Sequence, residues 1–132
     1  MPLTVRVDHA ARVAFVDVAG ALVTEEMIAA IDNVARQLDG RTGYGVLSDH
    51  RAVAAPITPE QVAQLLAHIS ASGSALIGAK WAVVVSKPAS YGMMRLLSAR
   101  AEELPVHVQA FWDHDEALAW LRGEPSTRDD VA

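Results

Sequence analysis

The segment from Lys80 to Arg122 constrains the fold more than any other part of the chain. It contains an uninterrupted apolar run, a stretch with helical periodicity, a run that alternates between apolar and polar residues, and a short helical pattern behind an acidic cap. The segment therefore predicts a strand, a helix, a strand and a helix. Because parallel neighbouring strands must be joined by a crossover, two successive strand–helix units predict an α/β fold.

The N-terminal part of the chain adds three strands and a helix. Two alternating runs, Leu3–Val7 and Arg12–Val18, flank a short turn and predict an N-terminal β-hairpin. Acidic residues in the first turn and a glycine at the end predict a helix that begins after Thr24 and stops at Gly40. A third strand is expected over Tyr44–Ser48.

The beginnings of the later helices carry capping signals. Thr58 is expected to cap a second helix, with Pro59 at its first position and Gln61 closing a capping box. A third helix is expected from about residue 90 to residue 103. Asp113 is expected to cap the last helix.

The strand patterns predict where each strand lies in the sheet. Trp81–Val85 has no polar member, which predicts the most central strand. Val106–Trp112 alternates, which predicts a half-exposed strand at an edge. The element order is β-β-α-β-α-β-α-β-α, in which residues 1–122 form a single domain and residues 123–132 form a disordered tail.

Composition excludes several classes of function. The chain has 132 residues and a net charge of −5, which argues against a nucleic-acid partner. It has no cysteine, so disulfides, thiolate nucleophiles and thiolate metal sites are absent. The N-terminus lacks the pattern of a signal peptide and no apolar stretch is long enough to span a membrane. We therefore expect a soluble, cytoplasmic protein without a membrane span.

Four stretches of the C-terminal half carry a family resemblance, namely Trp81–Val85, Tyr91–Arg95, Val106–Phe111 and Asp115–Leu121. Together they resemble the SpoIIAA-like proteins, an uncharacterised bacterial branch of the STAS-domain proteins, which are relatives of anti-sigma-factor antagonists. The resemblance implies a βα superhelix in which an N-terminal hairpin precedes parallel strands, with helices packed on the sheet. It also implies a non-enzymatic, regulatory protein-interaction module in bacteria.

Polar side chains follow three of the predicted parallel strands. Asp49, His50 and Arg51 follow the third strand, Lys87 follows the fourth, and His114 follows the fifth. Because the carboxyl ends of parallel strands meet at one edge, these residues are expected to share a rim of the kind where open α/β sheets bind ligands. The alternative function is therefore a binding protein for a small apolar or anionic ligand at this rim. A purely structural explanation of these polar residues also stays open, because loops between strands and helices are generally polar.

The resemblance also implies a phosphorylation site. In STAS antagonists a Ser or Thr at the head of the second helix is phosphorylated, and the added charge prevents docking on a partner. Only Thr58 occupies that place here, and the surrounding Ala55–Pro59 lacks the antagonists' pattern. Helix capping accounts for Thr58 without phosphorylation.

The remaining candidates are weaker. Tyr91, Met93, Met94 and Trp112 could line an apolar ligand pocket or simply fill the core. The histidines are scattered without metal-ligand spacing, so no metal and no cofactor is expected. We expect no catalytic residue and no enzymatic activity, because no nucleophile is accompanied by a base. The half-exposed edge strand and apolar helices leave room for a homodimer.

Overall fold

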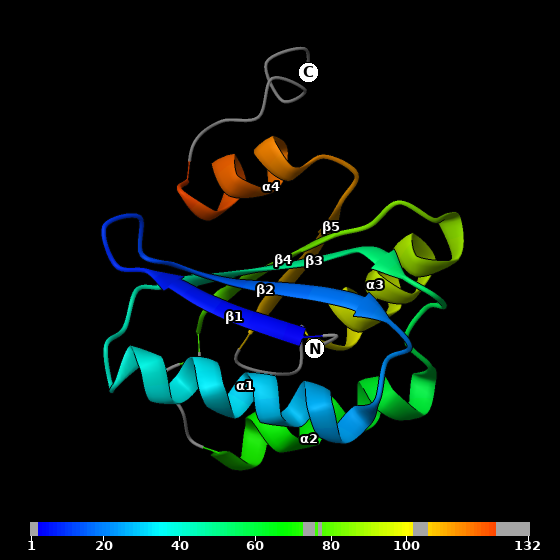
Figure 1. Ribbon diagram of the computed structural model, residues 1–132, viewed down its shortest axis with the longest axis horizontal. Helices are drawn as coiled ribbons and strands as arrows, with labels where there is room; N and C mark the ends of the chain where they lie inside the picture. Colours follow the sequence, from blue (N-terminus) through cyan, green and yellow to red (C-terminus); the bar gives the residue numbers. More distant parts are fainter. Residues whose placement is uncertain (1–2, 73–75, 77, 102–105, 124–132) are drawn as a thin grey trace.

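The computed structural model describes residues 3–72, 76, 78–101 and 106–123 of the chain (Figure 1). The described elements follow the expected order of strands and helices. Their bounds are β1 (Leu3–Asp8), β2 (Val13–Gly20), α1 (Thr24–Leu38), β3 (Gly45–Val53), α2 (Pro59–Ser72), β4 (Lys80–Val84), α3 (Pro88–Ala101), β5 (His107–Phe111) and α4 (His114–Leu121).

The strands form one sheet in the order β1-β2-β3-β4-β5. β1 is antiparallel to β2, which confirms the N-terminal hairpin, and the other neighbours are parallel. β5 lies at an edge of the sheet, as its alternating sequence predicts. The expectation that Trp81–Val85 forms the central strand is wrong, because β3 holds the middle of the sheet and β4 lies beside the edge strand.

The apolar sequence of β4 has a different cause, which is that helices cover both faces of the sheet. Helices α1, α2 and α3 lie on one face and α4 lies on the other (Figure 1). Successive β4 residues therefore alternate between two cores: Val83 packs beneath α1, α2 and α3, and Ala82 and Val84 pack beneath α4. A strand that is buried on both faces needs apolar residues throughout, whether or not it is central.

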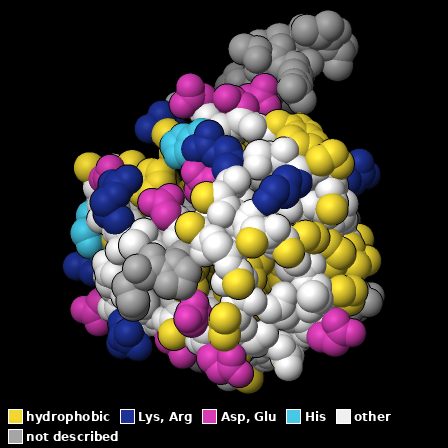
Figure 2. Space-filling model, turned by 45° about the vertical axis from the view of Figure 1, so that its right-hand side comes forward, with side chains coloured by type: hydrophobic (Ala, Val, Ile, Leu, Met, Phe, Trp, Pro, Cys, Tyr) yellow, Lys and Arg dark blue, Asp and Glu magenta, His cyan; other side chains and the backbone are white. Residues whose placement is uncertain are grey.

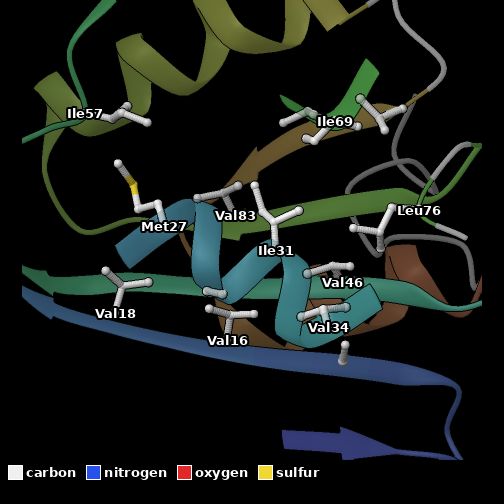
Figure 3. Packing of buried hydrophobic residues seen from close by; sticks show 14 of the residues in the cluster. Val16, Val18, Met27, Ile31, Val34, Val46, Ile57, Ile69, Leu76 and Val83 are labelled. Carbon is white, nitrogen blue, oxygen red and sulfur yellow. The ribbon is translucent and has the colours of Figure 1, made fainter. Parts of the chain in front are cut away.

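The larger core lies between the sheet and its three covering helices. Met27, Ile31 and Val34 of α1 are buried there in one cluster with Val16 of β2 and Val46 of β3 (Figure 3). Their spacing along α1 follows the helical repeat, so a single face of the helix is buried. This packing holds α1 against the sheet, where its backbone approaches β1 most closely.

β3 is longer than the sequence predicts. The expected strand ends at Ser48, whereas β3 continues through Asp49, His50 and Arg51 to Val53. The continuation forms because β2 extends alongside it, with one register shift between Asp17 and Ala19 of β2. Backbone pairing with β2 thus keeps these residues in a strand, although their polar sequence is typical of a loop.

Two helices begin earlier than expected. Thr24 is the first residue of α1, and Val23 precedes it as the N-cap without a side-chain bond. α3 begins at Pro88, because the Lys87 carbonyl accepts a hydrogen bond from the Tyr91 backbone N–H at 3.0 Å and proline suits the first helical position. The predicted end of that helix, near residue 103, and residues 124–132 of the tail that the sequence predicts to be disordered lie outside the described residues.

The predicted cap of the last helix is confirmed. Asp113 Oδ2 accepts a hydrogen bond from the Glu116 backbone N–H at 2.9 Å. The helix that follows packs closely on β3, since a Cβ added at Gly45 would lie 2.8 Å from Leu121 Cδ2.

Candidate functional site

Three of the predicted rim residues gather on the α4 face of the sheet. Asp49 and Arg51 lie two residues apart on β3 and therefore point to the same side. Arg51 donates to Asp49 through Nε to Oδ1 at 3.0 Å and through Nη2 to Oδ2 at 2.7 Å. Hydrogen bonding from Arg51 holds the pKa of Asp49 below its usual value, although partial burial acts in the opposite direction. The carboxylate is thus neutralised by its own strand neighbour.

His114 approaches this pair from the first turn of α4. Its ring lies parallel to that of Phe15 on β2, with 6.4 Å between the ring centroids. The electrostatic effect of His114 also lowers the pKa of Asp49. On β1, Arg6 sits 4.4 Å from the centre of the Phe15 ring. We call Asp49, Arg51 and His114 the rim cluster.

His50 lies on the opposite face of the sheet. It sits between Asp49 and Arg51 in the strand, so its side chain points the other way and lines a cavity beneath α1 and α3. Burial lowers the pKa of His50 to about 4, and the nearby charge of Asp49 only partly opposes this. The imidazole is therefore neutral at physiological pH.

Lys87 also stands apart from the rim cluster. Its Nζ donates to the Val53 carbonyl, and the neighbouring Ser86 hydroxyl donates to the Arg51 carbonyl at 3.1 Å. These bonds tie the connection after β4 to the end of β3. The five predicted ligand residues thus lie in three places: the rim cluster, the opposite face of the sheet, and the connection after β4. Lys87 has a structural role, because it links that connection to the end of β3.

A shallow depression of about 440 Å³ lies beside the rim cluster. Asp17, Asp49 and Arg51 supply its charged groups, and Thr4 and the end of β2 complete it. The depression contains the carboxylates of Asp17 and Asp49 and only one guanidinium, that of Arg51, which is already paired with Asp49. It therefore has no net positive charge with which to bind an anion. This geometry does not favour the small-anion interpretation of the rim.

Thr58 occupies the cap position that the sequence predicts. Its Oγ1 accepts from the Gln61 backbone N–H at 3.2 Å, and Gln61 Oε1 accepts from the Thr58 backbone N–H at 2.9 Å. Gln61 Nε2 also donates to the Leu22 carbonyl at 3.0 Å, which connects the head of α2 to the β2–α1 connection. The capping box is therefore confirmed, and the side chain of Thr58 is exposed.

The four residues proposed for an apolar pocket also separate. Met94 is buried and lines the same cavity as His50, whereas Met93 is only partly buried. Tyr91 and Trp112 stack at the surface with 4.8 Å between their ring centroids. Sequence reasoning missed the bond from Trp81 Nε1 to Ser48 Oγ at 2.8 Å, because the two residues are distant in the chain.

Two further structural findings concern metals and membranes. The described residues contain no group of three His, Asp or Glu side chains placed to hold a metal ion. Within the same part of the chain, no helix combines the length and the apolar composition that crossing a membrane requires.

No protein-family model and no curated protein matches this chain. Two solved structures resemble it. An uncharacterized protein of the DUF3478 family with a SpoIIAA-like fold, from Shewanella loihica PV-4, is 16% identical, with a TM-score of 0.62 over 90% of this chain and 91% of that chain. An anti-sigma factor antagonist from Mycobacterium paratuberculosis is 21% identical, with a TM-score of 0.59 over 91% of this chain and 94% of that chain. At such low identity the likeness concerns the fold and not the function. This chain therefore has a SpoIIAA-like, STAS-type fold, as the resemblance of its C-terminal half implies.

Proposed function

We propose that this chain is a non-enzymatic regulatory module that binds a protein partner at the edge of the sheet where the parallel strands end. The observation that carries the proposal is a set of exposed apolar residues on the connections, and in the first turn of α3, at this edge. We call this set the apolar rim, and it comprises Ala21, Val23, Ala54, Ala55, Pro88, Ala89 and Trp112.

Hydrogen bonds hold these connections side by side. The Ala54 backbone N–H donates to the Gly20 carbonyl at 2.8 Å, which joins the connections after β2 and β3. The bond from Lys87 to the Val53 carbonyl joins the connection after β4 to the same region. Figure 2 shows hydrophobic side chains gathered on the face that carries these connections, with Lys and Arg side chains nearby.

The polar groups near the apolar rim are used within the fold. Arg51 pairs with Asp49, Lys87 bonds to a backbone carbonyl, and Thr58 caps α2. A catalytic or ion-binding site needs polar groups that are free to meet a substrate, whereas a protein interface has a core depleted of charge and enriched in aromatic residues. Trp112 is 43% exposed and supplies such an aromatic anchor.

The comparison with solved structures adds an analogy to the argument from the surface. One of the two similar proteins is described as an anti-sigma factor antagonist, a name that denotes a regulator whose target is another protein. From it we carry over only this class of function. A bacterial origin, a cytoplasmic location and a homodimer all stay predictions.

Phosphorylation of Thr58 also stays a proposal. The hydroxyl is exposed at the head of α2, where the helix dipole favours an anion, and Ala55 of the apolar rim is three residues away. A phosphate would add a charge of about −2 beside an apolar interface and oppose docking.

A pair of matched variants tests the proposal. Partners are captured from the cells of origin, and each is purified and titrated against the wild-type chain, Ala55→Glu and Ala99→Glu. Ala99 is exposed on α3, eleven residues beyond Pro88, so its variant adds the same charge away from the apolar rim. We expect Ala55→Glu to weaken binding at least about tenfold, because it places a carboxylate in an apolar interface, and Ala99→Glu to leave it unchanged.

Equal binding by the wild-type chain and Ala55→Glu would refute the proposed surface. Light scattering separates one further outcome, because a dimer that Ala55→Glu dissociates would make a second copy of this chain the occupant of the apolar rim.

A further inference from the structure

The cavity behind β3 is the strongest unassigned feature of the molecule. It measures about 70 Å³ and lies between the sheet and helices α1, α2 and α3. Met27 and Ile31 enter from α1, and Val16, Val18 and Val83 rise from the sheet (Figure 3). Its lining is almost wholly apolar, which is typical of a cavity that water does not fill.

A second cavity of about 60 Å³ adjoins the first. The two share walls made by Ile31, Leu65, Trp81, Val83 and Leu97. Leu65 and Leu97 are only partly buried, so a change of their rotamers can open one cavity into the other. Together the cavities approach the size of an apolar cavity of ~150 Å³, which accommodates one benzene ring.

The first cavity has two polar lining residues. Ser48 and His50, which lie two residues apart on β3, both line it. The Ser48 hydroxyl oxygen already accepts a hydrogen bond from Trp81. Within the described part of the chain the His50 ring takes part in no hydrogen bond, and its partial exposure leaves its nitrogens within reach of solvent. A neutral imidazole has one donor and one acceptor nitrogen, so His50 supplies a hydrogen-bonding group on the wall of an otherwise apolar cavity.

We propose that the two cavities, joined into one, bind a neutral ligand of about the size of one aromatic ring that carries a single hydroxyl group. The ring occupies the apolar space beneath α1, and the hydroxyl exchanges a hydrogen bond with His50. A charged ligand is excluded, because burying an ion among these apolar side chains would cost more than one hydrogen bond returns. This site lies within the core beneath α1 and is separate from the apolar rim.

Phenol, benzene and benzoate are the probes that test the proposal. Binding is followed in ¹H–¹⁵N spectra through the indole N–H resonance of Trp81, which lines both cavities. We expect phenol to cause a saturable shift and to bind roughly fivefold more tightly than benzene, as one hydrogen bond predicts. Benzoate at neutral pH is expected to cause no saturable shift.

Substitutions at two positions locate the site. Ala30 of α1 lines the cavity, so Ala30→Leu fills it and is expected to weaken phenol binding at least about tenfold while the circular dichroism spectrum stays unchanged. Ala30→Val is the milder filling variant if Ala30→Leu does not fold. His50→Leu is expected to abolish the preference for phenol over benzene. The absence of saturation below about 10 mM phenol, undiminished binding in the folded filling variant, or benzoate binding as tight as that of phenol would overturn the proposal.

Discussion

Lowering the pH from 7 to 5 should destabilise the protein through His50 by an amount that one substitution can isolate. Burial lowers the pKa of this histidine from its ordinary value of 6.5 to about 4 in the folded chain. Between these two values the unfolded chain binds a proton that the folded chain does not bind. The contribution of neutral His50 to the free energy of unfolding is therefore fully present above pH 6.5. It is lost progressively as the pH drops toward 4.

The magnitude follows from the difference between the two pKa values. One pKa unit corresponds to about 1.4 kcal/mol, so the full loss is roughly 3 kcal/mol once the pH is below both values. At pH 5 the unfolded histidine is almost fully protonated, and the folded one is still mostly neutral. The loss between pH 7 and pH 5 is therefore about 2 kcal/mol.

Urea unfolding at pH 7 and at pH 5 measures this loss for the wild-type chain, His50→Gln and His107→Gln. The glutamine at position 50 does not titrate, so its variant should lose about 2 kcal/mol less than the wild type over this range, whatever its stability at pH 7. His107 is exposed on β5, and its variant serves as the control, which we expect to follow the wild type. If His50→Gln shows the same pH dependence as the wild type, His50 is not buried behind β3 and the arrangement of this strand is wrong.

Substitutions at four further positions test local features of the structure. Thr58→Ala should cost about 1 kcal/mol of unfolding free energy through loss of the cap, whereas Thr58→Ser should retain it, and equal stability would contradict the capping box. Gly45→Ala should destabilise by about 1 kcal/mol, because its Cβ would lie 2.8 Å from Leu121 Cδ2, and Gly92→Ala should stabilise by about 0.5–1 kcal/mol, because its Cβ meets nothing within 4 Å in a helix. Thermal unfolding compares the two glycine variants, and a reversed order would contradict the packing of α4. Asp49→Asn should cost less than about 1 kcal/mol at pH 7, since the guanidinium partner is half exposed, and this difference should vanish as the pH falls through the lowered pKa of Asp49. A difference that persists in acid would show that the loss is not electrostatic.

The features that the sequence predicts correctly are local ones. Thr58 and Gln61 lie three residues apart, and so do Asp113 and Glu116, so the pattern that identifies each cap contains every group that makes it. The hairpin and the parallel order of the later strands likewise follow from periodicity and crossover length.

The candidate site could not be predicted because its arrangement depends on where β3 ends. Asp49, His50 and Arg51 were expected in a connection, where neighbouring side chains can converge on one ligand. Within a strand, successive side chains point to opposite faces, so His50 separates from its two neighbours. The extension of β3 depends on the length of β2 beside it, which no local pattern at residues 49–51 records.

Lys87 illustrates a second limit of sequence reasoning. A lysine beside a proline at a strand end is typical both of an anion site and of a structural contact. Its partner, the Val53 carbonyl, belongs to another connection, so only the three-dimensional arrangement distinguishes the two roles.

Hydrogen–deuterium exchange of this chain with a purified partner tests the proposed function most directly. We predict that binding slows exchange in the connections at residues 20–23, 53–58 and 86–89 and at Trp112, and leaves the outer face of α1 unchanged. Slowed exchange confined to α1, or to the exposed edge of β5, would contradict the proposal that the apolar rim is the docking surface.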